Sequence, residues 1–160
     1  ICTEIGIDRV IPWASQRAIV QWKGPKADKG RAKWEGVARA AAKQSRRAFV
    51  PTVEGVMDSR ELTSWVASLT DEAGVVFVCH EEASESLGAA LASLQEAGAD
   101  APLPPRVALI VGPEGGIGPE ETGALVDAGA RMIGLGANVL RSSTAGAVAL
   151  TLIRAAAGAY

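Results

Sequence analysis

Residues 107–121 read VALIVGPEGGIGPEE, which is an apolar run, a glycine-rich turn and the start of a helix. The five consecutive apolar residues of Val107–Val111 are typical of a strand buried on both faces of a parallel sheet. Pro119 suits the first position of a helix, and the two glutamates after it favour the positive end of the helix dipole. The stretch predicts strand, turn and helix, the repeating unit of an α/β fold.

The same alternation extends along the chain in both directions. Further strands are expected at Ile7–Ile11, Ala18–Trp22, Val75–Cys79 and Arg131–Leu135, and helices at 31–45, 60–69, 84–97, from 119 onwards, and 144–157. A polar loop is expected over 24–30. We therefore predict an α/β fold with a mostly parallel sheet flanked by helices. In the helix at 31–45, apolar residues at helical spacing include Trp34, which this pattern assigns to the core.

The length of 160 residues and the 48% hydrophobic content indicate one globular domain. The sequence contains no long apolar run and no signal peptide, so neither a membrane protein nor an exported one is expected. Cys2 and Cys79 are isolated and His80 is the only histidine, which predicts no metal site and fits the reducing cytoplasm.

The net charge of −2 conceals a strong asymmetry. Residues 1–50 hold 11 Lys and Arg against 4 Asp and Glu, a net charge of +7, whereas residues 51–160 hold 5 against 14, a net charge of −9. A basic segment on an otherwise acidic protein favours a polyanionic partner, although an unevenly charged solvated surface would give the same count.

The turn at 112–118 follows a buried strand, where open α/β sheets bind ligands. Its glycines let the backbone approach a ligand closely, but they match neither the phosphate-binding P-loop nor the dinucleotide fingerprint. Acids at the start of the next helix disfavour a phosphate there. The pattern therefore favours a neutral or cationic ligand, with a purely structural turn as the alternative.

Residues 135–146 read LGANVLRSSTAG, a second loop between a strand and a helix. We expect one of its hydroxyl residues, Ser142, Ser143 or Thr144, to cap the helix. Arg141 is the only basic residue between Arg131 and Arg154. It is either a functional cation or a structural arginine that neutralises a buried carboxylate.

Together these loops resemble the 16S ribosomal RNA uridine-N3 methyltransferase family (RsmE) of the SPOUT superfamily, which shares Gly-Pro-Glu-Gly-Gly and a later Leu-Gly-x-x-Val-Leu-Arg-x-x-Thr-Ala. Residues 3–12, TEIGIDRVIP, and residues 41–47, AAKQSRR, also resemble stretches of that family. The sequence departs from the family at Ala137-Asn138, where Pro-Arg is frequent, and at Ser142-Ser143, where Thr-Glu is frequent.

The resemblance implies a C-terminal trefoil knot, a homodimer and S-adenosylmethionine as cofactor. It places residues around the cofactor from both loops: Ile110, Val111, Gly112, Glu114, Gly115, Gly116, Leu135, Gly136, Val139, Leu140, Ser142, Thr144 and Ala145. The apolar C-terminal helix, with more apolar surface than one face needs, is the expected dimer contact.

The implied reaction is methylation of uridine N3 in small-subunit (16S) ribosomal RNA. Arg141 is the candidate that stabilises negative charge on the uracil. The general base stays open, with Glu114 and His80 as candidates. The residues expected to hold RNA are Lys23, Arg31, Gln44, Ser45, Arg46 and Arg47, and Trp22 is a candidate to stack on bases.

The resemblance covers the SPOUT methyltransferase domain over residues 1–160. Family members also carry an N-terminal PUA-like RNA-binding domain, to which nothing in this sequence corresponds. A non-catalytic knotted RNA-binding module is the main alternative, because the family pattern is altered at two places. A general nucleotide-binding α/β domain is the third, weakened by the missing fingerprint.

Overall fold

The computed structural model describes residues 1–97 and 103–160. Its helices are α1 (Cys2–Ile5), α2 (Pro25–Gln44), α3 (Ser59–Asp71), α4 (Leu87–Ala97), α5 (Pro119–Asp127) and α6 (Ser142–Ala156). Its strands are β1 (Arg9–Val10), β2 (Trp13–Ala14), β3 (Thr52–Val53), β4 (Met57–Asp58), β5 (Val75–Cys79), β6 (Val107–Val111) and β7 (Arg131–Ile133). No helix in these described ranges has the length and apolar character needed to cross a membrane.

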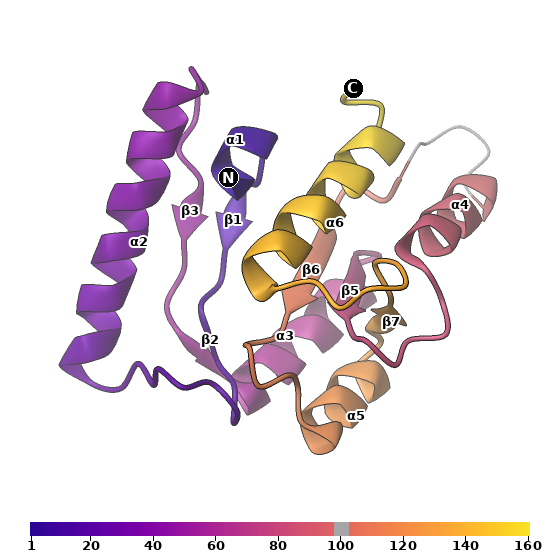
Figure 1. Ribbon diagram of the computed structural model, residues 1–160, viewed down its shortest axis with the longest axis horizontal. Coiled ribbons are helices and arrows are strands. Elements are labelled where there is room, and N and C mark those ends of the chain that lie inside the picture. Colours follow the sequence, from indigo (N-terminus) through magenta and orange to yellow (C-terminus); the bar gives the residue numbers. More distant parts are fainter. Residues whose placement is uncertain (98–102) are drawn as a thin grey trace.

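The strands form three parallel groups. The central sheet has the order β6-β5-β7, and two small sheets pair β1 with β3 and β2 with β4. In Figure 1 the arrows of β1, β3 and β6 all point toward the lower part of the molecule. The loops that follow parallel strands therefore gather at one edge, as the sequence predicted for the two glycine-rich loops.

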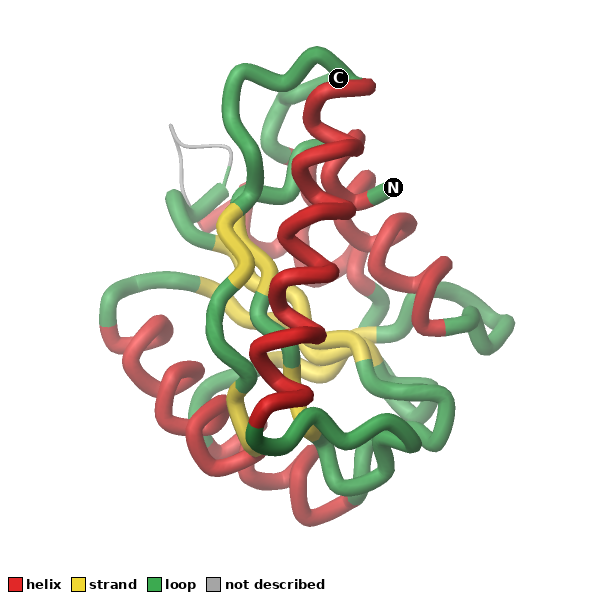
Figure 2. The backbone as a smooth tube through the Cα atoms, turned by 90° about the vertical axis from the view of Figure 1, so that its left-hand side faces the viewer, coloured by secondary structure: helices red, strands yellow, loops and turns green. Residues whose placement is uncertain are grey.

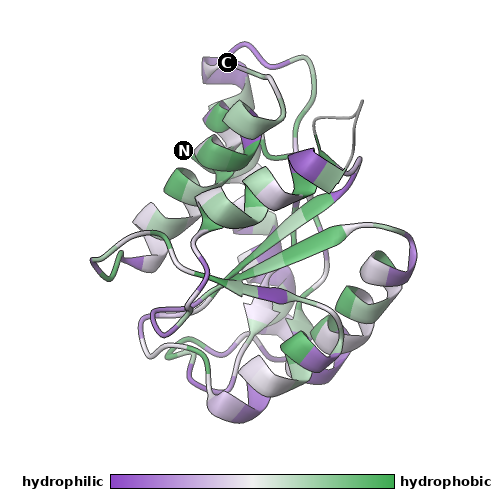
Figure 3. Ribbon diagram, turned by 90° about the vertical axis from the view of Figure 1, so that its right-hand side faces the viewer, coloured by the Kyte–Doolittle hydropathy of each residue, from purple (hydrophilic) through white to green (hydrophobic). Residues whose placement is uncertain are grey.

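The core lies on both faces of the central sheet. Val76 and Val78 of β5 point into a cluster with α3 and α5, whereas Phe77 points into a second cluster with α4 and α6. All three side chains have no exposed surface. Figure 3 shows these hydrophobic strands between the helical layers. The three-layer arrangement confirms the predicted mixed α/β fold.

The short N-terminal strands differ from the prediction. Only Arg9–Val10 of the expected strand Ile7–Ile11 is a strand, and β2 follows after Pro12. The expected strand Ala18–Trp22 is wrong, because these residues form a loop in which Ile19 is 84% exposed. β-Branched side chains favour a strand only where a second strand is available to pair with it. Residues 18–22 have no such partner strand among the described residues.

Helix α2 begins earlier than predicted. The expected loop at 24–30 is wrong: Pro25 starts the helix at its first turn, a position that proline suits because no hydrogen bond is lost there. Trp34 is 40% exposed rather than in the core, and Ala38 and Ala42 form the buried face. The Trp34 ring instead packs edge-on against Trp22, with ring centroids 5.0 Å apart. Figure 2 shows α2 running along the outside of the molecule.

Candidate functional site

A hydrogen bond joins the two glycine-rich loops. The Ser142 hydroxyl donates to a carboxylate oxygen of Glu114 at 2.9 Å, although 28 residues separate them in sequence. A bond from its own backbone amide and the bond from Ser142 hold the pKa of Glu114 below its ordinary value. The carboxylate is therefore ionised at neutral pH. It is a weaker base than an ordinary glutamate and a suitable neighbour for a cation.

The first loop, residues 112–118, is a tight turn after β6. Its backbone closes on itself through a bond from the Gly116 amide to the Pro113 carbonyl at 2.8 Å. The buried Ile117 side chain anchors the turn in the core. A side chain at Gly115 would place its Cβ 3.0 Å from the Arg17 carbonyl oxygen, so a larger residue would force a small shift of the backbone there. Glu114, Gly115 and Gly116, at the tip of the turn, are exposed.

The second loop, residues 134–141, leaves β7 and leads to α6. Gly136 has a φ of 126°, which other residues rarely adopt, and no atom lies within 4 Å of where its Cβ would be. Beside this open space Val139 is 76% exposed. An apolar side chain and open backbone of this loop thus face solvent, as a site for a partly apolar ligand requires.

The predicted cofactor residues differ in accessibility. Ile110 and Ala145 are each 6% exposed, and Ile110 belongs to the core beneath the first loop. The remaining members are accessible to different degrees. The half-buried ones are Val111, Gly112, Leu135, Leu140 and Ser142, and the exposed ones are Glu114, Gly115, Gly116, Gly136, Val139 and Thr144.

Arg141 occupies the N-cap of α6, so the predicted hydroxyl cap is wrong. Its carbonyl accepts from the amides of Thr144 and Ala145 at 2.8 Å each, while Ser142 uses its hydroxyl on Glu114. The Arg141 side chain is exposed and forms no ion pair with any described residue. The alternative of a structural arginine on a buried carboxylate is therefore wrong.

His80 has a structural setting. Its Nδ1 accepts from the Glu82 amide at 3.2 Å, and its own amide donates to the Ile133 carbonyl at 3.0 Å. These bonds fix the turn after β5 against β7. Because Nδ1 already accepts the bond from Glu82, it is not available to accept a proton from a substrate.

The predicted RNA-binding residues lie at both ends of α2. In Figure 1 this helix begins at the lower left of the molecule and ends at the top. Lys23 and Arg31 are exposed at the lower end, where Arg31 pairs with Glu35 at 3.0 Å. The second group, Gln44, Ser45, Arg46 and Arg47, lies at the far end, away from both loops of the same chain.

Two members of that second group are engaged within the protein. The Arg47 guanidinium donates to the Thr3 and Ile7 carbonyls and to Asp8, tying the end of α2 to the chain after α1. The Ser45 hydroxyl donates to the Ala41 carbonyl at 2.8 Å. Gln44 and Arg46 are exposed, so they are the members of this group whose side chains are open to a partner.

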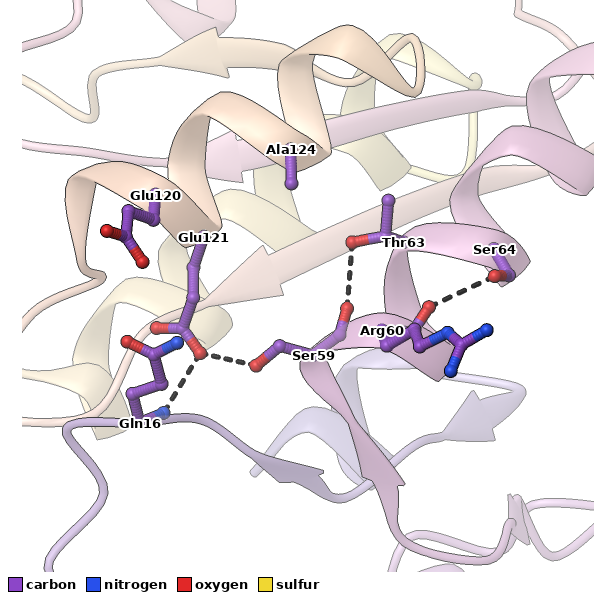
Figure 4. A pocket seen from close by; sticks show the side chains of 8 residues that line it. All are labelled: Gln16, Ser59, Arg60, Thr63, Ser64, Glu120, Glu121 and Ala124. Carbon is purple, nitrogen blue, oxygen red and sulfur yellow. Dashed lines mark hydrogen bonds between the residues drawn. The ribbon is translucent and has the colours of Figure 1, made fainter.

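A buried glutamate organises the other side of the first loop, and the sequence did not single it out. Glu121 is 4% exposed and accepts hydrogen bonds from the Gln16 amide at 2.9 Å and from the Ser59 hydroxyl. Figure 4 shows these three residues at a cavity of about 330 Å³ between the starts of α3 and α5. In the sequence Glu121 is distinguished only as an acidic residue in the first turn of α5. Glu120 has the same feature, so the sequence does not indicate which of the two is buried.

The chain is similar to known proteins over nearly its whole length. The family model described as an RNA methyltransferase domain matches residues 1–154. Ribosomal RNA small subunit methyltransferase E of Mycobacterium tuberculosis is 43% identical over 150 residues, which cover 94% of this chain and 54% of that protein. The Bacillus subtilis protein of the same name is 31% identical over 151 residues, 94% of this chain and 57% of that protein. The chain thus spans about half the length of the curated relatives it matches.

A solved structure gives the same result. The crystal structure of ribosomal RNA small subunit methyltransferase E from Neisseria gonorrhoeae, bound to S-adenosylmethionine, has a TM-score of 0.77 and 25% identity to this chain. The similarity covers 96% of this chain and 57% of that one. The two joined loops belong to the region that the family model matches, and the chain is a member of the RNA methyltransferase domain family.

Proposed function

We propose that residues 1–160 form a methyltransferase domain that binds S-adenosylmethionine and methylates N3 of a uridine in small-subunit (16S) ribosomal RNA. The observation that carries the proposal is the Ser142–Glu114 bond, which brings together the two loops that resemble the family. The relative from Neisseria gonorrhoeae, whose structure holds S-adenosylmethionine, supports the choice of cofactor.

The residues present fit this cofactor. Backbone at Gly136 is open, and the exposed Val139 side chain offers apolar surface to an adenine ring. The ionised Glu114 suits the positive charge of the donor, and the acids at the start of α5 disfavour a phosphate ligand. When bound, S-adenosylmethionine supplies a methyl group on a positively charged sulfur, which makes that carbon electrophilic.

The protein's task in the reaction is to hold the uracil in line and favour its anionic form. As the bond from N3 to the methyl carbon forms, the bond from that carbon to sulfur breaks and N3 loses its proton to a base. Arg141 is assigned to stabilise the charge that develops on the uracil oxygens, because its guanidinium is exposed and forms no ion pair with a described residue. Because its pKa is lowered, Glu114 is a weak base, and we assign it to binding the donor rather than to accepting the proton from N3.

Calorimetric titration with S-adenosylmethionine tests the site, using Gly136→Val and a matched control, Gly158→Val. Both glycines have positive φ and open space around the Cβ position, but Gly158 follows the end of α6. We expect the first variant to lose most of its affinity for the donor and the control to keep it. Equal affinities of wild type and both variants would refute the placement of the donor. Binding without methyl transfer would favour the non-catalytic RNA-binding module.

We also propose that the C-terminal segment is threaded as a SPOUT trefoil knot. The chain after β7 lies against the loop after β5, because the Gly134 amide donates to the Glu85 carbonyl at 2.8 Å and the Leu87 amide donates to the Gly134 carbonyl at 3.0 Å. From there it crosses to α6, which packs on β6 at the opposite edge of the central sheet. This path, from one edge of the sheet past the loop after β5 to the other edge, supports the proposed knot.

A homodimer through α6 is the proposed assembly. Ala145, Ala149 and Ile153 of α6 are buried, whereas Ala147, Val148, Thr151 and Leu152 line a shallow apolar hollow on its outer face. Leu152 is 42% exposed. A second copy of the chain would cover this face. Sedimentation of a monomer at micromolar concentration would contradict it.

The cytoplasm, where ribosomal RNA is made in bacteria, is the proposed location. The Cys79 thiol suits a compartment without disulfides, because burial raises its pKa to about 12 and keeps it protonated and unreactive. Cys2 is likewise unpaired.

A further inference from the structure

Arg17 lies directly on the first glycine-rich loop. Its Nη1 donates to the Gly115 carbonyl at 3.4 Å, and its Nε would be 3.9 Å from a Cβ placed at Gly118. The backbone of Arg17 approaches Gly115 so closely that no other residue fits there without a shift. A guanidinium from a segment nearly a hundred residues away in sequence is therefore part of the surface around this loop.

The turn that carries Arg17 is held at several points. Within it, the Ala18 amide donates to the Ser15 carbonyl at 3.2 Å. The Gln21 side-chain amide donates to the carbonyls of Ser15 and Ala18 at 3.1 and 2.9 Å. The neighbouring Gln16 amide is held by buried Glu121. The backbone that carries the long cationic side chain of Arg17 is thus held in place, which lowers the conformational entropy lost when Arg17 binds a ligand.

Arg17 and the Ser142–Glu114 bond contact the loop from different directions. Ser142 belongs to α6, which packs with α4 and the second core cluster. The segment of Arg17 is tied through Glu121 and Ser59 to the starts of α5 and α3, which cover the other face of the sheet. The donor is assigned to the side where the two loops meet. Arg17 therefore borders the site from outside the donor's own pocket.

The Arg17 guanidinium supplies, at the start of α5, the positive charge for a phosphate that the acids of this helix do not offer. It is exposed and forms no ion pair with a described residue. The chain continues from it into the exposed lysines at the start of α2, Lys23, Lys26 and Lys29, among which Asp28 is the one acid. Exposed guanidinium and ammonium groups on one continuous segment suit the repeating phosphates of a nucleic acid strand.

We propose that Arg17 binds a backbone phosphate of the substrate RNA next to the target nucleotide, linking the lysines of α2 to the donor loops. This inference rests on the proposed function, because it states how the RNA is held at that same site. Arg17 fixes where the strand lies relative to the loop at Gly115, and Arg141 then acts on the uracil.

The test measures binding of a labelled fragment of small-subunit ribosomal RNA by fluorescence anisotropy across a range of salt concentrations. The variants are Arg17→Ala, Arg17→Lys and the control Arg106→Ala. Arg106 stands at the start of β6, the end of the strand opposite the loop, so the control removes the same charge elsewhere. Calorimetry with S-adenosylmethionine is run on each variant.

Loss of one phosphate contact should weaken RNA binding roughly four- to sixfold at about 0.15 M salt and lower the salt slope by about one. Arg17→Lys should keep the slope, the control should match wild type, and donor affinity should stay within about twofold. An unchanged salt slope in Arg17→Ala, or failure of lysine to restore it, would overturn the proposal. A loss of donor affinity with unchanged RNA binding would also overturn it, because Arg17 would then bind the carboxylate of the donor. The proposal would likewise fail if the wild-type protein bound no RNA. If wild type binds RNA with the expected slope difference but transfers no methyl group, only the proposed function fails.

Discussion

Replacing Glu121 with alanine should strongly destabilise the protein. The side chain is 4% exposed and accepts from the Gln16 amide at 2.9 Å, from the Ser59 hydroxyl and, more weakly, from the Gly118 amide at 3.4 Å. Each buried donor left without a partner costs about 1–3 kcal/mol. Because Gln16 is exposed and Ser59 is only half-buried, water replaces some of the lost hydrogen bonds. We expect the free energy of unfolding to fall by about 2–4 kcal/mol.

Glu120→Ala is the matched control for this change. Both glutamates lie in the first turn of α5, so both interact with the helix dipole, but Glu120 is exposed. The control should lose less than about 1 kcal/mol. Glu121→Gln should fall between the two, because an amide keeps one acceptor oxygen for the two strong donors. Urea denaturation measures all three variants, and equal stability of Glu121→Ala and Glu120→Ala would refute the assigned role of the buried carboxylate.

Three further changes test the site and the assembly. Arg141→Ala should lose about 2–4 kcal/mol of transition-state stabilisation, roughly 30- to 1,000-fold in the single-turnover rate, with donor affinity unchanged; a normal rate would exclude its role. Ser142→Ala should raise the pKa of Glu114 toward its ordinary value, because a hydrogen-bond donor to the charged form is lost. A pH titration followed by NMR measures this pKa, and an unchanged value would contradict the prediction. In wild type the lowered pKa stabilises the folded state above the ordinary pKa of glutamate, a contribution that is lost as the pH falls through the lowered value. Leu152→Arg should dissociate the dimer in sedimentation while Val126→Arg, equally exposed at 42%, should not; the same result for both would contradict the interface.

The strands of the central sheet were predictable because burial on both faces leaves a clear sequence pattern. Val75–Cys79 and Val107–Val111 form strands with the predicted bounds. The two-residue strands β3 and β4 have no such pattern, since their pairing depends on β1 and β2, about 43 residues earlier. Ala18–Trp22 shows the opposite case, a strand-like composition without a partner strand.

The site was predictable where it follows single loops and not where distant segments meet. Glycine-rich turns after strands pointed to residues 112–118 and 135–146. The sequence could not show which of Glu120 and Glu121 is buried, because that depends on the helix phase and on Gln16. Arg17 was missed for the same reason, since its relation to Gly115 exists only after folding.

The most direct test of the central claim is transfer of a labelled methyl group. The protein is incubated with S-adenosylmethionine carrying a labelled methyl and with small-subunit ribosomal RNA, and the RNA is digested to nucleosides for chromatography and mass spectrometry. The proposed function predicts label in 3-methyluridine, a rate sharply lowered in Arg141→Ala, and no label in other nucleosides. Label in a different nucleoside, or donor binding and RNA binding with no label in RNA, would contradict it.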